Sequence, residues 1–142
     1  MTAPSSPYAL TLPARERDRL ARLGLARWPE EACGLMLGCD GRVRRLVLCR
    51  NVAARRADRY LVHARDFLRW DRAAHRLGLD ILGVWHTHPD GGARPSGTDR
   101  EQAWRGWSYL IAAVDGRAIT ELRSWRLRGD HFIEETLCLK PA

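Results

Sequence analysis

The chain has 142 residues and a formal net charge of +7, and 45% of its residues are apolar. This length and composition are typical of one globular domain and argue against a disordered protein, so we expect residues 1–142 to form a single domain. No apolar run approaches the ~20 residues of a membrane-spanning helix, and residues 1–8 lack the basic and apolar stretches of a secretory signal. We therefore expect a cytoplasmic protein that does not bind a membrane.

Arginine supplies nearly all of the positive charge, because Lys140 is the only lysine. A basic domain can bind nucleic acid or an acidic protein, but these arginines are scattered and recur on predicted helices, where solvent-exposed faces account for most of them. Motifs of known RNA- or DNA-binding folds are also missing. The charge alone therefore does not predict a nucleic-acid partner, and no pattern in the chain predicts an oligomeric state.

Hydrophobic periodicity and turn signals predict helices and strands as far as residue 85. Leucines spaced among charged residues, between Pro13 and Pro29, are typical of an amphipathic helix. The pair Asp40-Gly41 is typical of a tight hairpin turn between two strands. In chain order, the predicted elements are a helix over 14–27, strands over 32–38, 43–52 and 60–63, a helix over 65–77 and a strand over 80–85.

The remainder of the chain predicts a loop, a short helix and three strands. Glycine and proline dominate residues 89–95, and Thr98 with Glu101 predicts a capping box for a helix over 98–105. The last three strands are predicted over 109–114, 119–127 and 132–139. Together the elements predict an α/β (α+β) fold, in which a mixed, largely antiparallel sheet is flanked by two or three helices.

Four cysteines occur, and none forms a C-x-x-C pair, so a cysteine-based zinc site is not predicted. Cys33, Cys49 and Cys138 lie in apolar, strand-like runs, and we expect them to be buried. In a cytoplasmic protein these thiols are expected to stay reduced.

The stretch WHTHPDGGARPSGTD, residues 85–99, concentrates the residues that can bind a metal. His86 and His88 are two positions apart, which places both side chains on one face of an extended segment. Pro89 ends the strand, and the loop after it can bring Asp99 back as a third ligand. Two histidines and one carboxylate leave a fourth position open for water, which is typical of a catalytic zinc site. We therefore expect one Zn²⁺ per chain, with zinc favoured over other divalent ions by the imidazole ligands.

A hydrolytic zinc site also needs a group that takes a proton from the water and gives one to the leaving amine. Glu30 and Glu31 precede the apolar strand over 32–38, and either carboxylate could project into a cleft there. Ser96 could donate a hydrogen bond to the oxyanion of a tetrahedral intermediate. Alternatively, Ser96 is a helix N-cap with Asp99 in the first turn, a local role that does not exclude catalysis.

Taken together, these residues resemble the JAMM, or MPN-plus, metalloprotease signature, a distant glutamate followed by H-x-H-x7-S-x-x-D. Every position is present, as Glu31-Ala-Cys-Gly, His86-Thr-His88-Pro and Ser96-x-x-Asp99. The resemblance implies the MPN/JAB-like, cytidine-deaminase-like fold, with zinc bound by His86, His88 and Asp99. It also implies Glu31 as the general acid/base, because the family glutamate stands two residues before a Cys-Gly pair, and Ser96 as the oxyanion donor.

Within this family, the chain resembles the short, stand-alone bacterial type, whose PDEACG-like segment is similar to residues 29–34. The resemblance implies hydrolysis of the bond after the C-terminal Gly-Gly tail of a ubiquitin-like or sulfur-carrier protein. Two reactions stay open: release of an amino acid or short peptide from a sulfur carrier, or deconjugation of a bacterial ubiquitin-like modifier from target lysines. A third alternative is a metal-free MPN scaffold that only binds partners, although such scaffolds typically lack the zinc ligands that this chain keeps.

Overall fold

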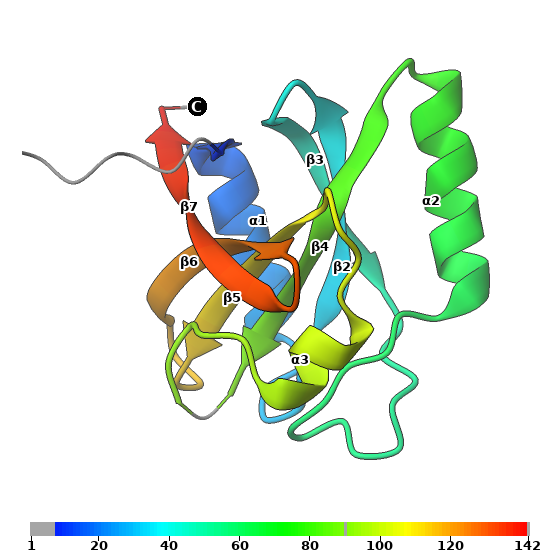
Figure 1. Cartoon of the computed structure of the whole chain (residues 1–142). Helices are drawn as coiled ribbons and strands as arrows, with labels where there is room; N and C mark the ends of the chain where they lie inside the picture. Colours follow the sequence, from blue (N-terminus) through cyan, green and yellow to red (C-terminus); the bar gives the residue numbers. More distant parts are fainter. Residues whose placement is uncertain (1–7, 90, 142) are drawn as a thin grey trace, which may run out of the picture.

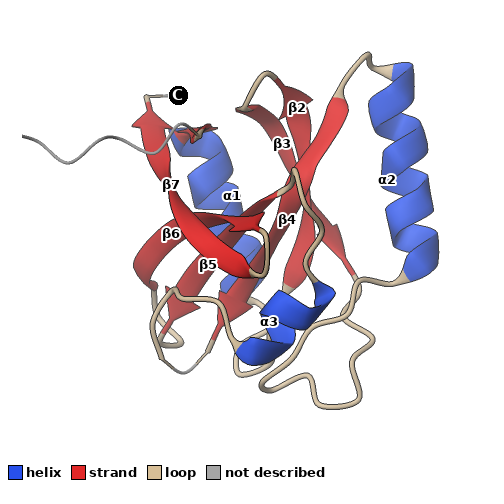
Figure 2. Ribbon diagram, viewed as in Figure 1, coloured by secondary structure: helices blue, strands red, loops and turns tan. Residues whose placement is uncertain are grey.

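Seven strands form a closed barrel in the computed structural model, which describes residues 8–89 and 91–141 (Figure 1, Figure 2). The strands are β1 (Ala9–Pro13), β2 (Cys33–Cys39), β3 (Arg42–Cys49), β4 (Asp80–His88), β5 (Ser108–Val114), β6 (Ile119–Arg128) and β7 (His131–Lys140). Around the barrel they follow the order β1-β3-β2-β4-β5-β6-β7. The pairs β1–β3, β1–β7 and β4–β5 are parallel and the others antiparallel. The mixed, largely antiparallel sheet is therefore confirmed.

Three helices occur in the described part of the chain: α1 (Ala14–Leu25), α2 (Ala64–Arg76) and α3 (Gly97–Gln102). α1 contacts β1 and β3, and α2 lies along the outside of the barrel against β2, β3 and β4 (Figure 1). The three predicted helices are confirmed, although α3 is shorter than expected. Among the helices of the described residues, none has the length and apolar character needed to cross a membrane.

The two ends of the barrel sheet meet through β1, a strand that the sequence patterns did not predict. β1 pairs in parallel with β7 over its whole length and meets β3 through Thr11 and Arg42. Its Leu10 and Leu12 are buried. Five residues ending in a proline contain too few alternating positions to give a clear strand signal. Barrel closure could therefore not be read from local periodicity.

The strand predicted over 60–63 is wrong, because this segment forms only an isolated bridge between Asn51 and Val62. The side chain of Asn51 takes the place of a strand ladder there. Its Nδ2 donates to the carbonyl of Arg59 at 2.9 Å, and its Oδ1 accepts the Leu61 amide at 3.0 Å. These bonds satisfy backbone groups that would otherwise pair with a neighbouring strand.

The register between β2 and β4 is set by a close contact of Gly34 with Trp85. These residues are direct partners, and the Trp85 indole donates to the carbonyl of Val47 at 2.9 Å. A Cβ on Gly34 would lie 1.8 Å from that carbonyl oxygen and 2.5 Å from the indole nitrogen. Only glycine leaves room for this bond, and the same register places Cys33 opposite His86.

The four cysteines are free thiols. Cys33 and Cys49 are buried partners on β2 and β3, as predicted, whereas Cys138 is half-buried. Burial raises the pKa of Cys49 to about 12, so this thiol stays protonated at neutral pH.

Candidate functional site

Three side chains predicted as metal ligands converge at the end of β4. His86 and His88 project from the same face of the strand, and Asp99 comes from the first turn of α3. Their Nε2 atoms lie 3.1 Å apart, and Asp99 Oδ2 lies 3.3 Å from that of His86 and 3.2 Å from that of His88. The three atoms form a nearly equilateral triangle.

The dimensions of this triangle fit a zinc ion. Ligands ~2.0–2.1 Å from a tetrahedral zinc are separated from one another by about 3.3 Å. All three sides of the triangle are close to that value. The donor set of two imidazoles and one carboxylate also matches the ligands of known hydrolytic zinc sites.

Neighbouring groups hold the triangle in place. His88 Nδ1 lies 2.9 Å from the carbonyl of Gly92, and the ring of Tyr60 stacks on His86. Asp99 Oδ2 also accepts the Ser96 amide at 2.8 Å, while Ser96 Oγ accepts the Asp99 amide at 3.0 Å. This reciprocal pair is the capping box of α3. The prediction of Ser96 as the N-cap is confirmed, and the box predicted from Thr98 and Glu101 is wrong because the helix begins at Gly97.

Burial and mutual hydrogen bonds shift the pKa values of all three side chains of the triangle. Burial lowers the pKa of His86, which is fully buried. Burial would also lower the pKa of His88, but its hydrogen bonds to Asp99 and Gly92 raise it overall. For Asp99, burial is outweighed by the hydrogen bonds from both histidines, which hold its pKa well below the usual range. Asp99 is therefore a carboxylate at any physiological pH.

Glu31 lies beside the two histidines. Glu31, His86 and His88 each offer a ligand atom within 4.8 Å of the others, so these three could also hold an ion. The separations involving Asp99 are shorter, which makes Asp99 the better match to a third ligand of a tetrahedral ion. The carboxyl of Glu31 is buried, and its Oε1 has no hydrogen-bond partner among the described residues. Burial raises the pKa of Glu31 to about 8.

The backbone directs Glu31 inward and Glu30 outward. The Glu31 amide donates to the carbonyl of Arg56 at 2.7 Å, and its carbonyl accepts from Asn51 Nδ2 at 2.9 Å. The side chain of Glu30 is exposed and forms an ion pair with Arg56 at 2.8 Å. Of the two carboxylates that the sequence chemistry left open, only Glu31 reaches the histidines.

Two cavities open along the face of β4 that carries Val84, His86 and His88. Val84 lines an apolar groove of about 560 Å³, and His88 lines a polar cavity of about 340 Å³. Segments 57–62 and 96–102 contribute walls to both of them. The groove and the cavity therefore lie on either side of His86 along the strand.

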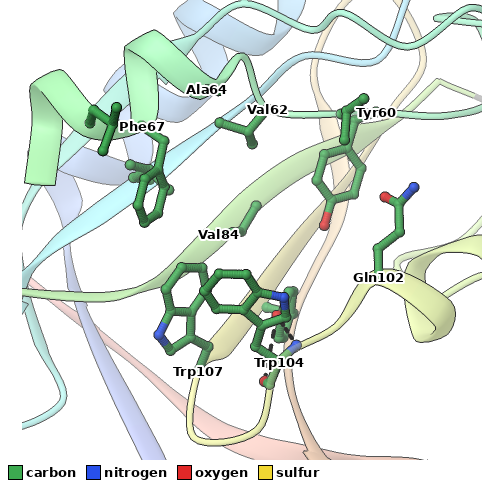
Figure 3. Close-up of a pocket in the computed structure, with 12 residues that line it drawn as sticks. Tyr60, Val62, Ala64, Phe67, Val84, Gln102, Trp104 and Trp107 are labelled. Carbon is green, nitrogen blue, oxygen red and sulfur yellow. Dashed lines mark hydrogen bonds between the residues drawn. The ribbon is translucent and has the colours of Figure 1, made fainter.

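Aromatic rings dominate the apolar groove. Figure 3 shows Tyr60, Val62 and Phe67 along one side and Trp104 and Trp107 along the other, with Val84 between them. The side chain of Trp104 is 60% exposed, a large fraction for an apolar residue. The lining residues are Leu35, Tyr60, Leu61, Val62, Ala64, Phe67, Leu68, Val84, Gln102, Trp104, Trp107 and Tyr109.

The polar cavity contains Glu31 together with Ser96. Because Ser96 Oγ accepts the Asp99 amide, its hydroxyl hydrogen remains available to a ligand. The cavity is lined by Glu31, Ala57, Asp58, His88, Pro89, Gly92, Arg94 and Ser96.

Two residues that line the cavities, Tyr60 and Arg94, were not predicted as site residues from the sequence. No local pattern marks Tyr60, and the position of Arg94 inside the glycine- and proline-rich loop was the one available signal.

Residues 13–128 match the family described as prokaryotic homologs of the JAB domain. The desampylase of Haloferax volcanii is 34% identical over 139 residues, covering 92% of this chain and 96% of that protein. A probable TtuB-protein conjugate cleaving protease of Thermus thermophilus is 36% identical over 89 residues, covering 62% of this chain and 59% of that protein.

Two solved structures share the fold. Protein DSY2949 from Desulfitobacterium hafniense has a TM-score of 0.82 at 27% identity, and 94% of each chain is covered. The JAB1/MPN domain protein AF2198 from Archaeoglobus fulgidus has a TM-score of 0.55 at 15% identity, covering 93% of this chain and 98% of that one. At that identity the second likeness concerns the fold alone.

Proposed function

The chain belongs to the family of prokaryotic homologs of the JAB domain, and from this premise we propose that it hydrolyses the bond after the C-terminal Gly-Gly tail of a ubiquitin-like or sulfur-carrier protein. The predicted family and its JAB/MPN fold are confirmed. Relatives named desampylase and conjugate cleaving protease support a hydrolase. The observation that carries the proposal is the triangle of His86, His88 and Asp99 with Glu31 beside it.

His86, His88 and Asp99 would hold the metal, and their spacing supports zinc. Zinc at such a site supplies Lewis-acid polarisation of the scissile carbonyl and lowers the pKa of water from ~15.7 toward ~7. Asp99 brings a negative charge that partly balances a divalent ion. Gly92 and Ser96 orient His88 and Asp99 through their backbone groups, so the ligand set is held before an ion arrives.

Glu31 would carry the protons of the reaction. Its Oε1 is buried without a hydrogen-bond partner among the described residues, so the atom can accept a proton from the attacking water. A carboxyl whose pKa is raised can then give that proton to the leaving amine. Both roles require Glu31 to face the scissile bond, which its place beside His88 in the polar cavity supports.

Ser96 would donate its hydroxyl hydrogen to the oxyanion that forms on the scissile carbonyl. The capping box fixes Ser96 relative to Asp99, and therefore relative to the rest of the triangle. A substrate tail lying along β4 would pass Val84 in the apolar groove before it reaches the histidines. The leaving group would then occupy the polar cavity with Glu31.

Deconjugation from target lysines is the second candidate, and the names of the Haloferax and Thermus relatives favour it. Both reactions use the same residues and differ only in the leaving amine. Two model substrates separate them: a ubiquitin-like protein extended by one amino acid after Gly-Gly, and the same protein joined through Gly-Gly to a lysine side chain. Mass spectrometry of the products shows which bond the zinc-loaded protein cuts.

The matched variants for this assay are Glu31→Gln and Glu30→Gln. Turnover should fall by ~10²–10⁴-fold in Glu31→Gln, since removing a general acid/base costs about that much. Glu30→Gln should stay near wild type, because the Glu30 carboxylate is exposed and paired with Arg56. Full activity of Glu31→Gln would remove Glu31 from the mechanism. Failure of zinc-loaded wild type to cleave either substrate would instead favour a scaffold that only binds partners.

A further inference from the structure

The loop that carries Arg94 is anchored on both sides of this residue. The Ala93 amide donates to Glu121 Oε1 at 3.0 Å, and the Ala93 carbonyl accepts from the Trp125 indole at 2.9 Å. On the other side, the Ser96 amide donates to Asp99. The backbone is therefore held on both sides of Arg94, which is one of the residues that line the polar cavity.

Arg94 brings a positive charge that forms no ion pair within the described part of the chain, although it helps to lower the pKa of the nearby Glu121 carboxyl. Asp58, which lines the same cavity, forms an ion pair with Arg55 at 2.6 Å. Glu121, beside the Arg94 backbone, pairs with Arg123 at 2.9 Å and accepts the Ala93 amide. Over residues 8–89 and 91–141, no carboxylate lies within 4.0 Å of the Arg94 guanidinium. A guanidinium without an ion-pair partner can bind an anion bidentately.

We propose that Arg94 forms a subsite for the α-carboxylate of a single amino acid that leaves from the tail. This inference rests on the proposed function, because Glu31 must protonate the leaving amine inside the same cavity. In hydrolysis, the water oxygen bonds to the tail carbonyl carbon, the C–N bond breaks, and the nitrogen leaves as the amine of the released amino acid. The α-carboxylate is separated from that nitrogen by a single carbon, so it enters the cavity together with the amine.

Only one of the two candidate reactions places a carboxylate beside Arg94. A lysine side chain in a conjugate has no carboxylate next to its ε-nitrogen, so it offers no anion for Arg94 to bind. A C-terminal amino acid after Gly-Gly presents the carboxylate at the position of the leaving group. Arg94 therefore favours release of a terminal amino acid over cleavage of a lysine conjugate.

The test uses metal-free protein and two short peptides ending in Gly-Gly-Ala, one with a free carboxylate and one with a carboxamide. Wild type should bind the free acid about 10- to 100-fold more tightly than the amide. A hydrogen bond between two charged groups typically increases affinity by about this factor. Arg94→Gln should bind both peptides equally. The matched control is Arg76→Gln, which removes the same charge at the last residue of α2, outside the polar cavity, and should keep the preference.

Equal binding of the two peptides by wild type, or no measurable binding of the free acid, overturns the subsite. A preference that survives in Arg94→Gln also overturns it, and circular dichroism confirms that this variant is folded. Turnover of the same peptides by zinc-loaded protein addresses the proposed function separately. Cleavage of both peptides at equal rates would support the proposed hydrolase activity and reject the carboxylate subsite at Arg94. Tight, Arg94-dependent binding without cleavage would reject the hydrolase activity and support the subsite.

Discussion

The ring of Tyr60 stacks on the imidazole of His86, with ring centroids 4.3 Å apart and ring planes inclined by 24°. Tyr60 lines the apolar groove, and His86 is a corner of the triangle formed with His88 and Asp99. Both side chains are almost fully buried. The contact therefore joins the wall of the apolar groove to the candidate metal centre.

Replacing Tyr60 by alanine should lower the free energy of unfolding by about 3–5 kcal/mol, the usual cost of removing a large buried aromatic ring. Tyr60→Phe keeps the stacked ring, so its free energy of unfolding should fall much less. Urea unfolding of the metal-free proteins measures both changes. Equal losses in the two variants would show that the hydroxyl, rather than the ring, makes the stabilising contact.

Removing one corner of the triangle should abolish metal binding. We expect about one zinc per wild-type chain by elemental analysis, and none in His88→Ala, because two remaining ligands bind zinc too weakly. His75→Ala is the matched control, since His75 is exposed on α2 and contributes nothing to the site. Stoichiometric zinc in His88→Ala would refute its role as a ligand.

The stability of the metal-free protein should depend on the ionisation of Glu31. Burial raises its pKa from 4.5 to about 8, so between these values the folded state binds more protons than the unfolded state. The free energy of unfolding should then fall as the pH rises from 4.5 to 8. Glu31→Gln removes this contribution, so the stability difference between wild type and variant, measured by urea unfolding, should change steadily over that range. A constant difference would show that Glu31 has an ordinary pKa.

Gly34 should tolerate no side chain. In Gly34→Ala the new methyl group would lie 1.8 Å from the Val47 carbonyl oxygen, so β2 must shift away from β3 or lose the Trp85 bond. We expect a loss of at least ~1–3 kcal/mol in the free energy of unfolding, typical of overpacking. Gly97→Ala should have little effect, because a Cβ there meets nothing within 4 Å. Thermal unfolding of the two variants checks the contrast, which equal melting temperatures would contradict.

Several elements follow from residues that are close together in the sequence. Asp40 and Gly41 have φ angles of 53° and 71°, the conformation that this pair favours in a tight hairpin, and β2 and β3 pair on either side of it. His86 and His88 share a face because alternate residues of any strand do. The sequence therefore predicted the hairpin and two of the three corners of the triangle from local rules.

Other features depend on segments that are distant in the chain. The sequence by itself determined the family signature and the order of most helices and strands, since spacing and periodicity are local. The family signature had already favoured Glu31 over Glu30. Only the tertiary structure decided that β1 closes the barrel, that Glu30 pairs with Arg56, and that Tyr60 lines the apolar groove and Arg94 the polar cavity. These positions result from packing and hydrogen bonds between segments tens of residues apart, and no local period encodes which segments will meet.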